Sequence, residues 1–294
     1  MWPAPLQALP AISTVPAAAV RLRVTLECAG NGRGQVSPRY PSVPWLEEGV
    51  STAEWTGVPL ALLLAIAGLR SDAKDIVFRG ADRGFDRGVE HEFARSLEPE
   101  LARREEVLLA YAMNGEALPP QHGAPLRLVV PHWYGMASVK WLYAIEAIDR
   151  KFDGLQQASG YHFRSAAGEK GAPCTFMRVN SLMVPPGIPD FYTRKRIVAP
   201  GAIPISGRAW SGAGHIDRVE LAVNGTWRDA VVERRQFEHA WQAWRVTWDA
   251  RPGEHELACR ATDSTGERQP LEPPWDASGF GNNGVQRIEV TVRP

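Results

Sequence analysis

The C-terminal third of the sequence carries the feature that most restricts the fold, a series of short segments in which apolar and polar residues alternate. Turn residues separate the segments, and Asn224-Gly225 inside one of them is a strong signal for a tight hairpin. Six of the 11 tryptophans also lie after residue 205, where they supply large apolar side chains. The pattern predicts an immunoglobulin-like β-sandwich of roughly 90 to 100 residues. Its alternating segments are residues 204–212, 215–227, 243–250, 253–263 and 285–292.

The preceding region mixes helical and strand patterns without a regular alternation between them. Residues 56–69 predict a buried helix, with a proline in the first turn and a glycine near the end. Residues 74–84 predict a short strand that runs into a turn at residues 81–84, and Asn114-Gly115 predicts another hairpin. This order of elements is typical of an α+β domain rather than of a doubly wound sheet.

Proline and glycine mark the join between the two regions. The stretch 161–204 contains "VPPGIPD" and "APGAIP", which interrupt regular structure. We therefore expect a connector there and two domains, residues 1–170 and residues 171–294. A chain of 294 residues is long enough to bury a core in each domain.

Composition and charge exclude several classes of protein. Hydrophobic residues make up 44% of the chain and charged residues 22%, as in soluble globular proteins. The net charge is zero, so no overall field attracts nucleic acid or an anionic membrane. The longest apolar run, residues 58–69, is too short to span a bilayer, and the first 20 residues lack a secretory pattern. We predict a cytoplasmic location, with a periplasmic one as the alternative if a leader precedes this chain.

One of the three cysteines ends an alternating strand. In "RLRVTLECAGNGRG", residues 21–34, Cys28 continues the inward apolar row, Thr25 and Glu27 fall on the outward row, and a glycine-rich turn follows. Two interpretations stay open from these residues alone. A free cysteine is commonly a small buried hydrophobic side chain, whereas a thiolate beside a glycine turn and Arg33 is suited to ligating a metal or to nucleophilic attack. The cysteine spacing shows no disulfide framework, zinc site or haem attachment motif.

Several motifs occur together in a fixed order. The chain contains "ECAGNGR", "STAEW" before Gly57 to Leu69, "GADRG" and "HGAPLRLVVPHWYGMASVKWL", and the tryptophan-rich β region follows them. In this order they resemble the sulfite oxidase family of molybdenum enzymes, in its bacterial, haem-free form, over nearly the whole chain from "LQALP" onward. The resemblance implies a molybdopterin domain of mixed α/β structure followed by an immunoglobulin-like dimerisation domain.

The resemblance also implies a molybdenum-molybdopterin cofactor, without haem, and the residues that hold it. Cys28 matches the cysteine whose thiolate ligates molybdenum, and soft thiolate ligands suit redox metals. Arginine grips a phosphate through two parallel hydrogen bonds, and lysine adds a point charge. Taken singly, such residues are more often turn formers or solvated side chains. Five further positions match residues that contact the pterin or its phosphate: Asp82, His122, Arg127, Ser138 and Lys140.

A pocket for a small oxyanion substrate is implied by the same resemblance. Arg33 matches an arginine of the anion pocket, Trp45 a tryptophan that lines it, and Tyr161 a tyrosine near the metal that can donate a proton. Two departures from the family pattern are visible. No Arg-Asn-His-like motif is present in residues 1–20, and Ser278 in "PPWDASGFGNN" stands where sulfite oxidases usually carry an arginine. We therefore expect Arg33 to be the single cation of the pocket, which would hold a doubly charged anion poorly.

Three functions are compatible with these residues. The first is a molybdenum-cofactor-dependent oxidoreductase that transfers an oxygen atom on a small sulfur oxyanion and passes electrons to an external acceptor. The second is a homodimeric, non-catalytic or cofactor-poor remnant of the family. The third, a β-sandwich binding module fused to an α+β domain, leaves the ordered motifs unexplained and ranks last. The resemblance also implies a homodimer through residues 171–294, with no nucleic acid partner and no membrane span.

Overall fold

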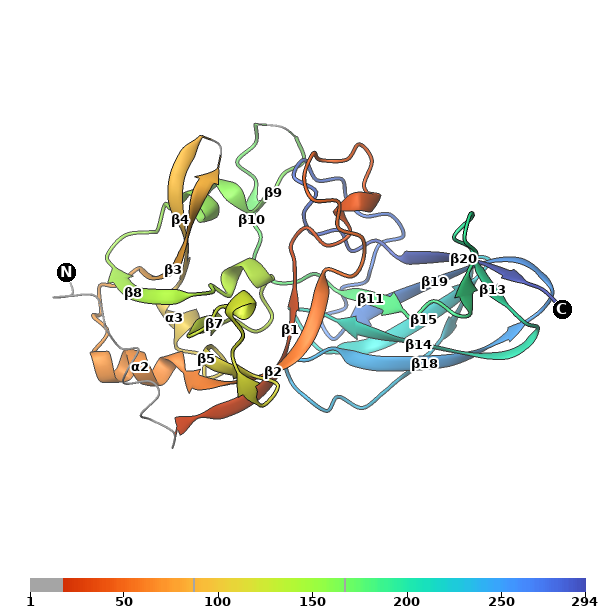
Figure 1. Ribbon diagram of the computed structural model, residues 1–294, viewed down its shortest axis with the longest axis horizontal. Helices are drawn as coiled ribbons and strands as arrows, with labels where there is room; N and C mark the ends of the chain where they lie inside the picture. Colours follow the sequence, from red (N-terminus) through yellow and green to blue (C-terminus); the bar gives the residue numbers. More distant parts are fainter. Residues whose placement is uncertain (1–17, 87, 167) are drawn as a thin grey trace. The chain divides into compact units, whose positions relative to one another are not determined.

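The computed structural model describes residues 18–86, 88–166 and 168–294 (Figure 1). The chain forms two compact units that are discontinuous in sequence. The sequence predicts a single domain boundary between residues 170 and 171, without this discontinuity, and that boundary stays a proposal. The first unit comprises the residues up to Ala29, Ser51–Thr175 and Asp276–Phe280, and the second comprises Gly30–Val50, Phe176–Trp275 and Gly281–Pro294.

Two sheets and little helix build most of the first unit. One sheet has the strand order β1-β2-β5-β6, with β7 paired to β5, and the other has the order β4-β3-β8. Leu60 of the helix, Phe78 of β3 and Leu128 of β7 are fully buried in one core, so the helix and both sheets share it. The elements are β1 (Val20–Glu27), β2 (Val50–Pro59), α2 (Leu60–Ala67), β3 (Asp75–Asp86), β4 (Val89–Leu97), α3 (Pro99–Ala102), β5 (Leu108–Met113), β6 (Glu116–Ala117), β7 (Arg127–Val129), β8 (Leu142–Ile148), β9 (His162–Phe163) and β10 (Ala172–Pro173).

The second unit is a β-sandwich, as the sequence predicts. Its sheets have the strand orders β11-β14-β18-β17 and β12-β13-β20-β19-β15-β16. Trp244 and Trp248 of one sheet and Leu221 of the other lie in one core. Cys259 is fully buried there, and burial raises its pKa to about 12, so this thiol is a packing residue. The strands are β11 (Asn180–Met183), β12 (Ile188–Pro189), β13 (Arg196–Val198), β14 (Gly201–Trp210), β15 (Ile216–Val223), β16 (Thr226–Asp229), β17 (Val231–Val232), β18 (Gln242–Ala250), β19 (Gly253–Asp263) and β20 (Gln286–Val292).

Both hairpins predicted from Asn-Gly pairs are present. Asn114 and Gly115 have φ angles of 53° and 83° between β5 and β6. Asn224 and Gly225 have φ angles of 49° and 78° between β15 and β16. Positive φ at both central residues is the geometry of a type I′ turn, which favours Asn followed by Gly. The two hairpins and the α+β class are therefore confirmed.

Two predictions about local structure are wrong in part. The predicted helix is shorter, because β2 runs through Pro59; α2 begins at Leu60 and ends before Gly68, which caps it with a φ angle of 70°. The turn predicted at residues 81–84 is absent, because β4 pairs with β3 on both sides of a register shift between Arg79 and Arg83. The reversal of the chain therefore comes only after Asp86. Likewise, the predicted connector over 161–204 contains β11 and β13, which belong to the sandwich.

Strand β1 is buried on both faces near its end. Val24 faces the core, but Thr25 and Glu27, expected on the outward row, are only 1% and 2% exposed. The Thr25 hydroxyl hydrogen-bonds to that of Thr52 in β2 at 2.6 Å. A Cβ atom on Gly135 would lie 3.4 Å from the Glu27 carbonyl oxygen, so the chain around Gly135 packs against the end of β1. No helix within the described residues is both long and apolar enough to cross a membrane.

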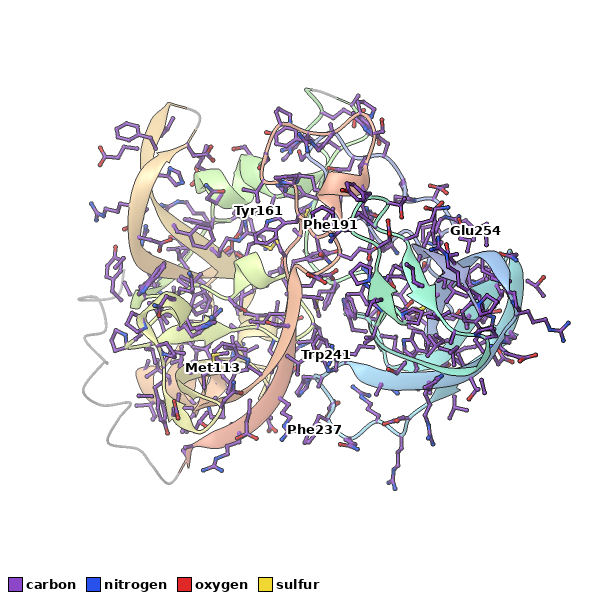
Figure 2. All side chains as sticks on the ribbon, turned by 45° about the vertical axis from the view of Figure 1, so that its right-hand side comes forward. Met113, Tyr161, Phe191, Phe237, Trp241 and Glu254 are labelled. Atoms are coloured by element: carbon purple, nitrogen blue, oxygen red, sulfur yellow. The ribbon has the colours of Figure 1, made fainter. Side chains whose placement is uncertain are left out.

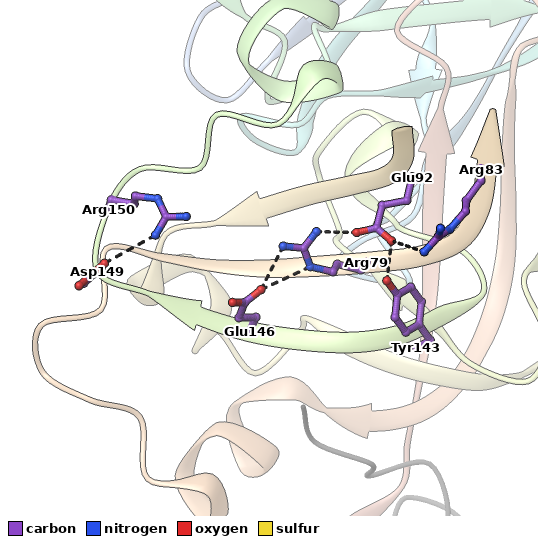
Figure 3. A network of polar contacts seen from close by, with 7 residues as sticks. All are labelled: Arg79, Arg83, Glu92, Tyr143, Glu146, Asp149 and Arg150. Atoms are coloured by element: carbon purple, nitrogen blue, oxygen red, sulfur yellow. Dashed lines mark hydrogen bonds and ion pairs between the residues drawn. The ribbon is translucent and has the colours of Figure 1, made fainter. Parts of the chain in front are cut away.

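Charged side chains on the β4-β3-β8 sheet form a network (Figure 3). Arg79 in β3 donates to Glu92 in β4 at 2.5 Å and to Glu146 in β8 at 3.1 Å. Glu92 also accepts a hydrogen bond from Tyr143 in β8 and lies 3.6 Å from Arg83. Burial acts to raise the pKa of Glu92, but the hydrogen bonds from Tyr143 and Arg79 and the charges of Arg79 and Arg83 outweigh it. The pKa of Glu92 therefore lies below its usual value, and the carboxylate links three strands.

A Glu92→Gln variant should unfold with a free energy lower by roughly 1 kcal/mol at neutral pH, because the amide keeps the shape but not the charge. Since the folded-state pKa of Glu92 is lowered, its contribution is present above the unfolded pKa of about 4.5 and is lost as pH falls through the folded pKa. Urea unfolding of the wild type and variant at neutral and acidic pH measures this. The more exposed Glu146→Gln is the control and should change less. If the Glu92→Gln variant and the wild type differ in unfolding free energy by the same amount at every pH, the lowered pKa of Glu92 is contradicted.

Candidate functional site

Cys28 lies directly after β1 and is half-buried. Because the Glu27 carbonyl packs against Gly135, the end of the strand that carries Cys28 lies beside the turn η4 (Gly135–Ala137). Ser138 ends this turn. The cysteine motif and the "MASVKW" motif, more than a hundred residues apart in sequence, are therefore neighbours within the first unit.

Arg127 of β7 is a buried cation. Its side chain donates to the carbonyl oxygens of His122 and Ser138, each at 3.0 Å, and its guanidinium carbon lies 4.7 Å from the centre of the Trp55 ring. Burial lowers its pKa to about 10, and the residue is only 5% exposed. Among the described residues its hydrogen-bond acceptors are carbonyl oxygens, and no carboxylate pairs with it. A buried charge held in this way favours binding of an anion.

Lys140 lies near this cation, and Asp82 lies near Lys140. Lys140 Nζ donates to the Gln121 carbonyl at 3.1 Å. Burial lowers the pKa of Lys140, the charge of Arg127 lowers it further, and Asp82 opposes the shift. Burial raises the pKa of Asp82, while its own backbone hydrogen bond and Lys140 oppose the rise. The Oδ1 atom of Asp82 is buried, and none of the residues that the structure describes hydrogen-bonds to it.

Two glycines allow the segments around these side chains to approach one another. A Cβ atom on Gly80 would lie 2.4 Å from Asp82 Oδ1 and 2.7 Å from the Lys140 carbonyl oxygen. Gly123 has a φ angle of 103°, and a Cβ atom there would lie 2.8 Å from Lys140 Cβ. Only glycine fits both positions without displacement. The motifs "GADRG" and "HGAPLR" therefore meet at Lys140.

His122 and Ser138 contribute mainly through their backbone. The side chain of His122 is exposed at the end of the short turn η3 (Pro120–His122), and its carbonyl accepts from Arg127. Ser138 is buried, and its hydroxyl oxygen accepts a hydrogen bond from the Val130 amide at 3.0 Å. The structure thus brings all five predicted pterin-contacting positions into one region, although their roles stay predictions.

Tyr161, labelled in Figure 2, follows the π-helical turn η5 (Gln156–Gly160). Its ring stacks on that of Phe280, with centroids 5.1 Å apart and an angle of 22° between planes. The guanidinium carbon of Arg95 in β4 lies 5.6 Å from the Tyr161 ring centre. The Tyr161 carbonyl accepts from the Cys174 amide at 2.9 Å. The sequence motifs do not indicate Arg95, because its neighbours come from distant segments.

Ser278 also has an arginine beside it. Arg164 Nη1 donates to Ser278 Oγ at 3.1 Å, and the backbone amides of both residues donate to the Asp276 carboxylate. The sequence pattern expects no cation at this point, since serine replaces the usual arginine. A guanidinium from another segment nevertheless lies there, and neither Arg164 nor Arg95 belongs to a family motif in the sequence.

Arg33 and Trp45 belong to the second unit. Arg33 is buried, its Nη1 atom donates to Ser42 Oγ at 3.0 Å, and its guanidinium carbon lies 5.9 Å from the Tyr40 ring centre. A Cβ atom on Gly30 would lie 2.4 Å from Arg33 Nη2, so glycine leaves the room that the guanidinium fills. Trp45 has an exposed side chain. The predicted lack of an Arg-Asn-His-like motif concerns residues 1–20, of which residues 1–17 lie outside the described residues.

Comparison with known proteins identifies the class. Residues 9–156 match the oxidoreductase molybdopterin binding domain, and residues 173–293 match the Mo-co oxidoreductase dimerisation domain. Mitochondrial sulfite oxidase of Mus musculus is 33% identical over 92% of this chain and 52% of its own. The NADH nitrate reductase 1 of Phaseolus vulgaris is 30% identical over 91% of this chain and 34% of its own. The crystal structure of the sulfane dehydrogenase SoxCD from Paracoccus pantotrophus covers 97% of this chain and 74% of its own, with a TM-score of 0.80 and 27% identity.

These matches define a molybdopterin-binding oxidoreductase domain joined to a dimerisation domain. Within that class, the chain belongs to the sulfite oxidase family. The chain spans about half the length of the curated sulfite oxidases that it matches. The family and the fold predicted from the sequence motifs are therefore confirmed.

A Gly123→Ala variant should lose about 1 to 2 kcal/mol of unfolding free energy, because alanine is strained at a φ angle of 103° and its methyl group would meet Lys140. Chemical denaturation monitored by tryptophan fluorescence measures the loss. Gly84→Ala is the matched control, since Gly84 has no positive φ and open space around it. Equal stability of the Gly123→Ala variant and the wild type would show that the close approach to Lys140 is not required.

Proposed function

We propose that the protein is a molybdenum-cofactor-dependent oxidoreductase that transfers an oxygen atom on a small sulfur oxyanion. The buried charge of Arg127, which lies near Lys140 and has no carboxylate partner among the described residues, is the observation that carries this proposal. The activities named for two of the relatives, sulfite oxidase and sulfane dehydrogenase, support a sulfur compound as the substrate.

The side chains around Arg127 fit molybdopterin. Arg127 and Lys140 would neutralise its phosphate. The buried Oδ1 atom of Asp82, which lacks a described partner, would accept a hydrogen bond from an N–H group of the pterin. The glycines at positions 80 and 123 keep the surrounding backbone close-packed. When bound, the cofactor supplies a redox-active molybdenum atom, for which the thiolate of Cys28 is the proposed protein ligand.

The proposed net reaction with sulfite is an oxidation at sulfur. Sulfite gains one oxygen atom from water and becomes sulfate, while two electrons and two protons are released. The electrons pass to an external acceptor. Tyr161 is proposed to hold or donate a proton at its phenol oxygen, and Arg33 and Trp45 are proposed to bind and orient the anion. The cytoplasmic location suggested by the sequence stays a prediction.

Metal analysis tests the cofactor assignment. Protein purified from a host that makes molybdopterin should contain about one molybdenum atom per chain, and a Cys28→Ala variant should contain much less, since it lacks the thiolate ligand. Cys259→Ala is the control, because that thiol is buried in the sandwich core, and it should keep the metal. If neither the wild type nor the control contains molybdenum or pterin, a cofactor-poor member of the family is the better description.

The match to a dimerisation domain supports a homodimer formed through the sandwich. Sedimentation velocity at micromolar protein concentration should therefore give twice the mass of one chain. The mass should stay the same in the Cys28→Ala variant, because Cys28 lies in the first unit rather than in the sandwich. A strict monomer under these conditions would contradict the homodimer proposal.

A further inference from the structure

The side chain of Arg95 is a second buried cation in the first unit. Arg95 is 4% exposed, and burial lowers its pKa to about 10. Its Nη1 atom donates to the Gln156 carbonyl at 2.6 Å. Its Nε atom is buried and has no hydrogen-bond partner among the described residues. One donor of a buried guanidinium thus stays unused beside the Tyr161 ring.

Arg260 of the sandwich is an arginine with a structural role, and its contacts can be compared with those of Arg95. Its guanidinium carbon also lies against an aromatic ring, 4.0 Å from the centre of Trp227. Its Nε and Nη2 atoms, however, each lie 2.9 Å from the carboxylate of Glu220, so it is paired with a carboxylate. No carboxylate in the part of the chain that the structure describes forms such a pair with Arg95. Packing alone therefore does not account for a charged residue at position 95.

The neighbours of Arg95 add positive charge. Arg164 donates to the Ser159 carbonyl at 2.6 Å and to Ser278 Oγ at 3.1 Å. Burial and the charges of Arg164 and Arg95 lower the pKa of His162, whose Nδ1 atom is buried with no described partner. The nearby carboxylate of Asp276 accepts from backbone amides, including that of Arg164 at 2.6 Å. Two guanidinium groups, those of Arg95 and Arg164, therefore lie among the segments next to Tyr161.

We infer that Arg95, assisted by the charge of Arg164, is a specificity-determining residue that binds a doubly charged sulfur oxyanion beside Tyr161. This inference rests on the proposed function and deepens it. The unused Nε–H group of Arg95 donates to an oxygen atom of the anion, and the Tyr161 hydroxyl is a second donor within the same group of side chains. Arg164 supplies charge at Ser278, the position where the family pattern has an arginine. Two cations outside the family motifs, Arg95 and Arg164, thus take part in holding the anion.

Sulfate serves as a probe because it has the charge and size of the proposed substrate and product and undergoes no turnover. Isothermal titration of the full-length protein as purified should show sulfate binding. The dissociation constant should rise about 10- to 100-fold in Arg95→Met, as expected for the loss of one hydrogen bond to a charged group. Arg95→Lys, which retains the charge, should bind with intermediate affinity. Arg260→Met, the matched control, should bind as the wild type does.

Three outcomes overturn the inference: no sulfate binding by the wild type, equal binding by the wild type and Arg95→Met, or loss of binding only in Arg127→Met. The last result would place the anion at the predicted pterin phosphate position. If Arg95→Met does not fold, as judged by circular dichroism, Arg95→Lys and Arg95→Gln replace it in the same comparison.

Molybdenum content, measured on each variant, separates this inference from the proposed function. Dependence of sulfate binding on Arg95 in protein that lacks molybdenum supports the anion site and contradicts the cofactor proposal. Molybdenum at the wild-type level, with sulfate binding that does not depend on Arg95, supports the cofactor proposal and contradicts the anion site at Arg95.

Discussion

The buried guanidinium of Arg127 is the interaction on which the first unit depends. It ties the carbonyl of His122 to that of Ser138 and lies against Trp55 of β2, so it joins three segments that are separate in sequence. Removing this charge from water costs free energy, which hydrogen bonds to carbonyl dipoles offset only in part. The described residues provide no carboxylate to complete the compensation. A bound anion would complete it, which explains why Lys140 and the close glycine contacts gather at the same place.

A buried charge in the second unit, that of Glu220, is paired with opposite charges. Glu220 is buried, and it accepts hydrogen bonds from Arg260 at 2.9 Å and Arg268 at 3.2 Å. The buried carboxylate of Glu220 is thus compensated by guanidinium groups of the same unit. Cys259 follows the same logic, since burial raises its pKa and keeps the thiol neutral. Glu220 and Cys259 therefore serve packing in the sandwich, whereas Arg95 and Arg127 of the first unit are buried cations with no carboxylate partner among the described residues.

Local features of the fold could be predicted from the sequence, and long-range ones could not. The Asn-Gly hairpins and the end of α2 at Gly68 depend on the φ angles of one or two adjacent residues, which residue type determines. Thr25 and Glu27 are buried although alternation assigns them to the outward face, and the backbone of Glu27 lies beside Gly135, a residue far away in sequence. Pairing with β4 likewise extends β3 through residues 81–84, which the sequence pattern predicts as a turn.

The same limit explains why the sequence does not predict the cations near Tyr161. Arg95 contacts Gln156, 61 positions away, and Arg164 contacts Ser278, 114 positions away. A comparison made position by position finds serine at residue 278 and infers that a charge is lost. Binding of an anion, however, depends on where a charge lies in space and not on which residue of the chain supplies it. The small side chain of Ser278 accepts a hydrogen bond from Arg164, so a serine at the position where the resemblance implies an arginine still has a guanidinium beside it.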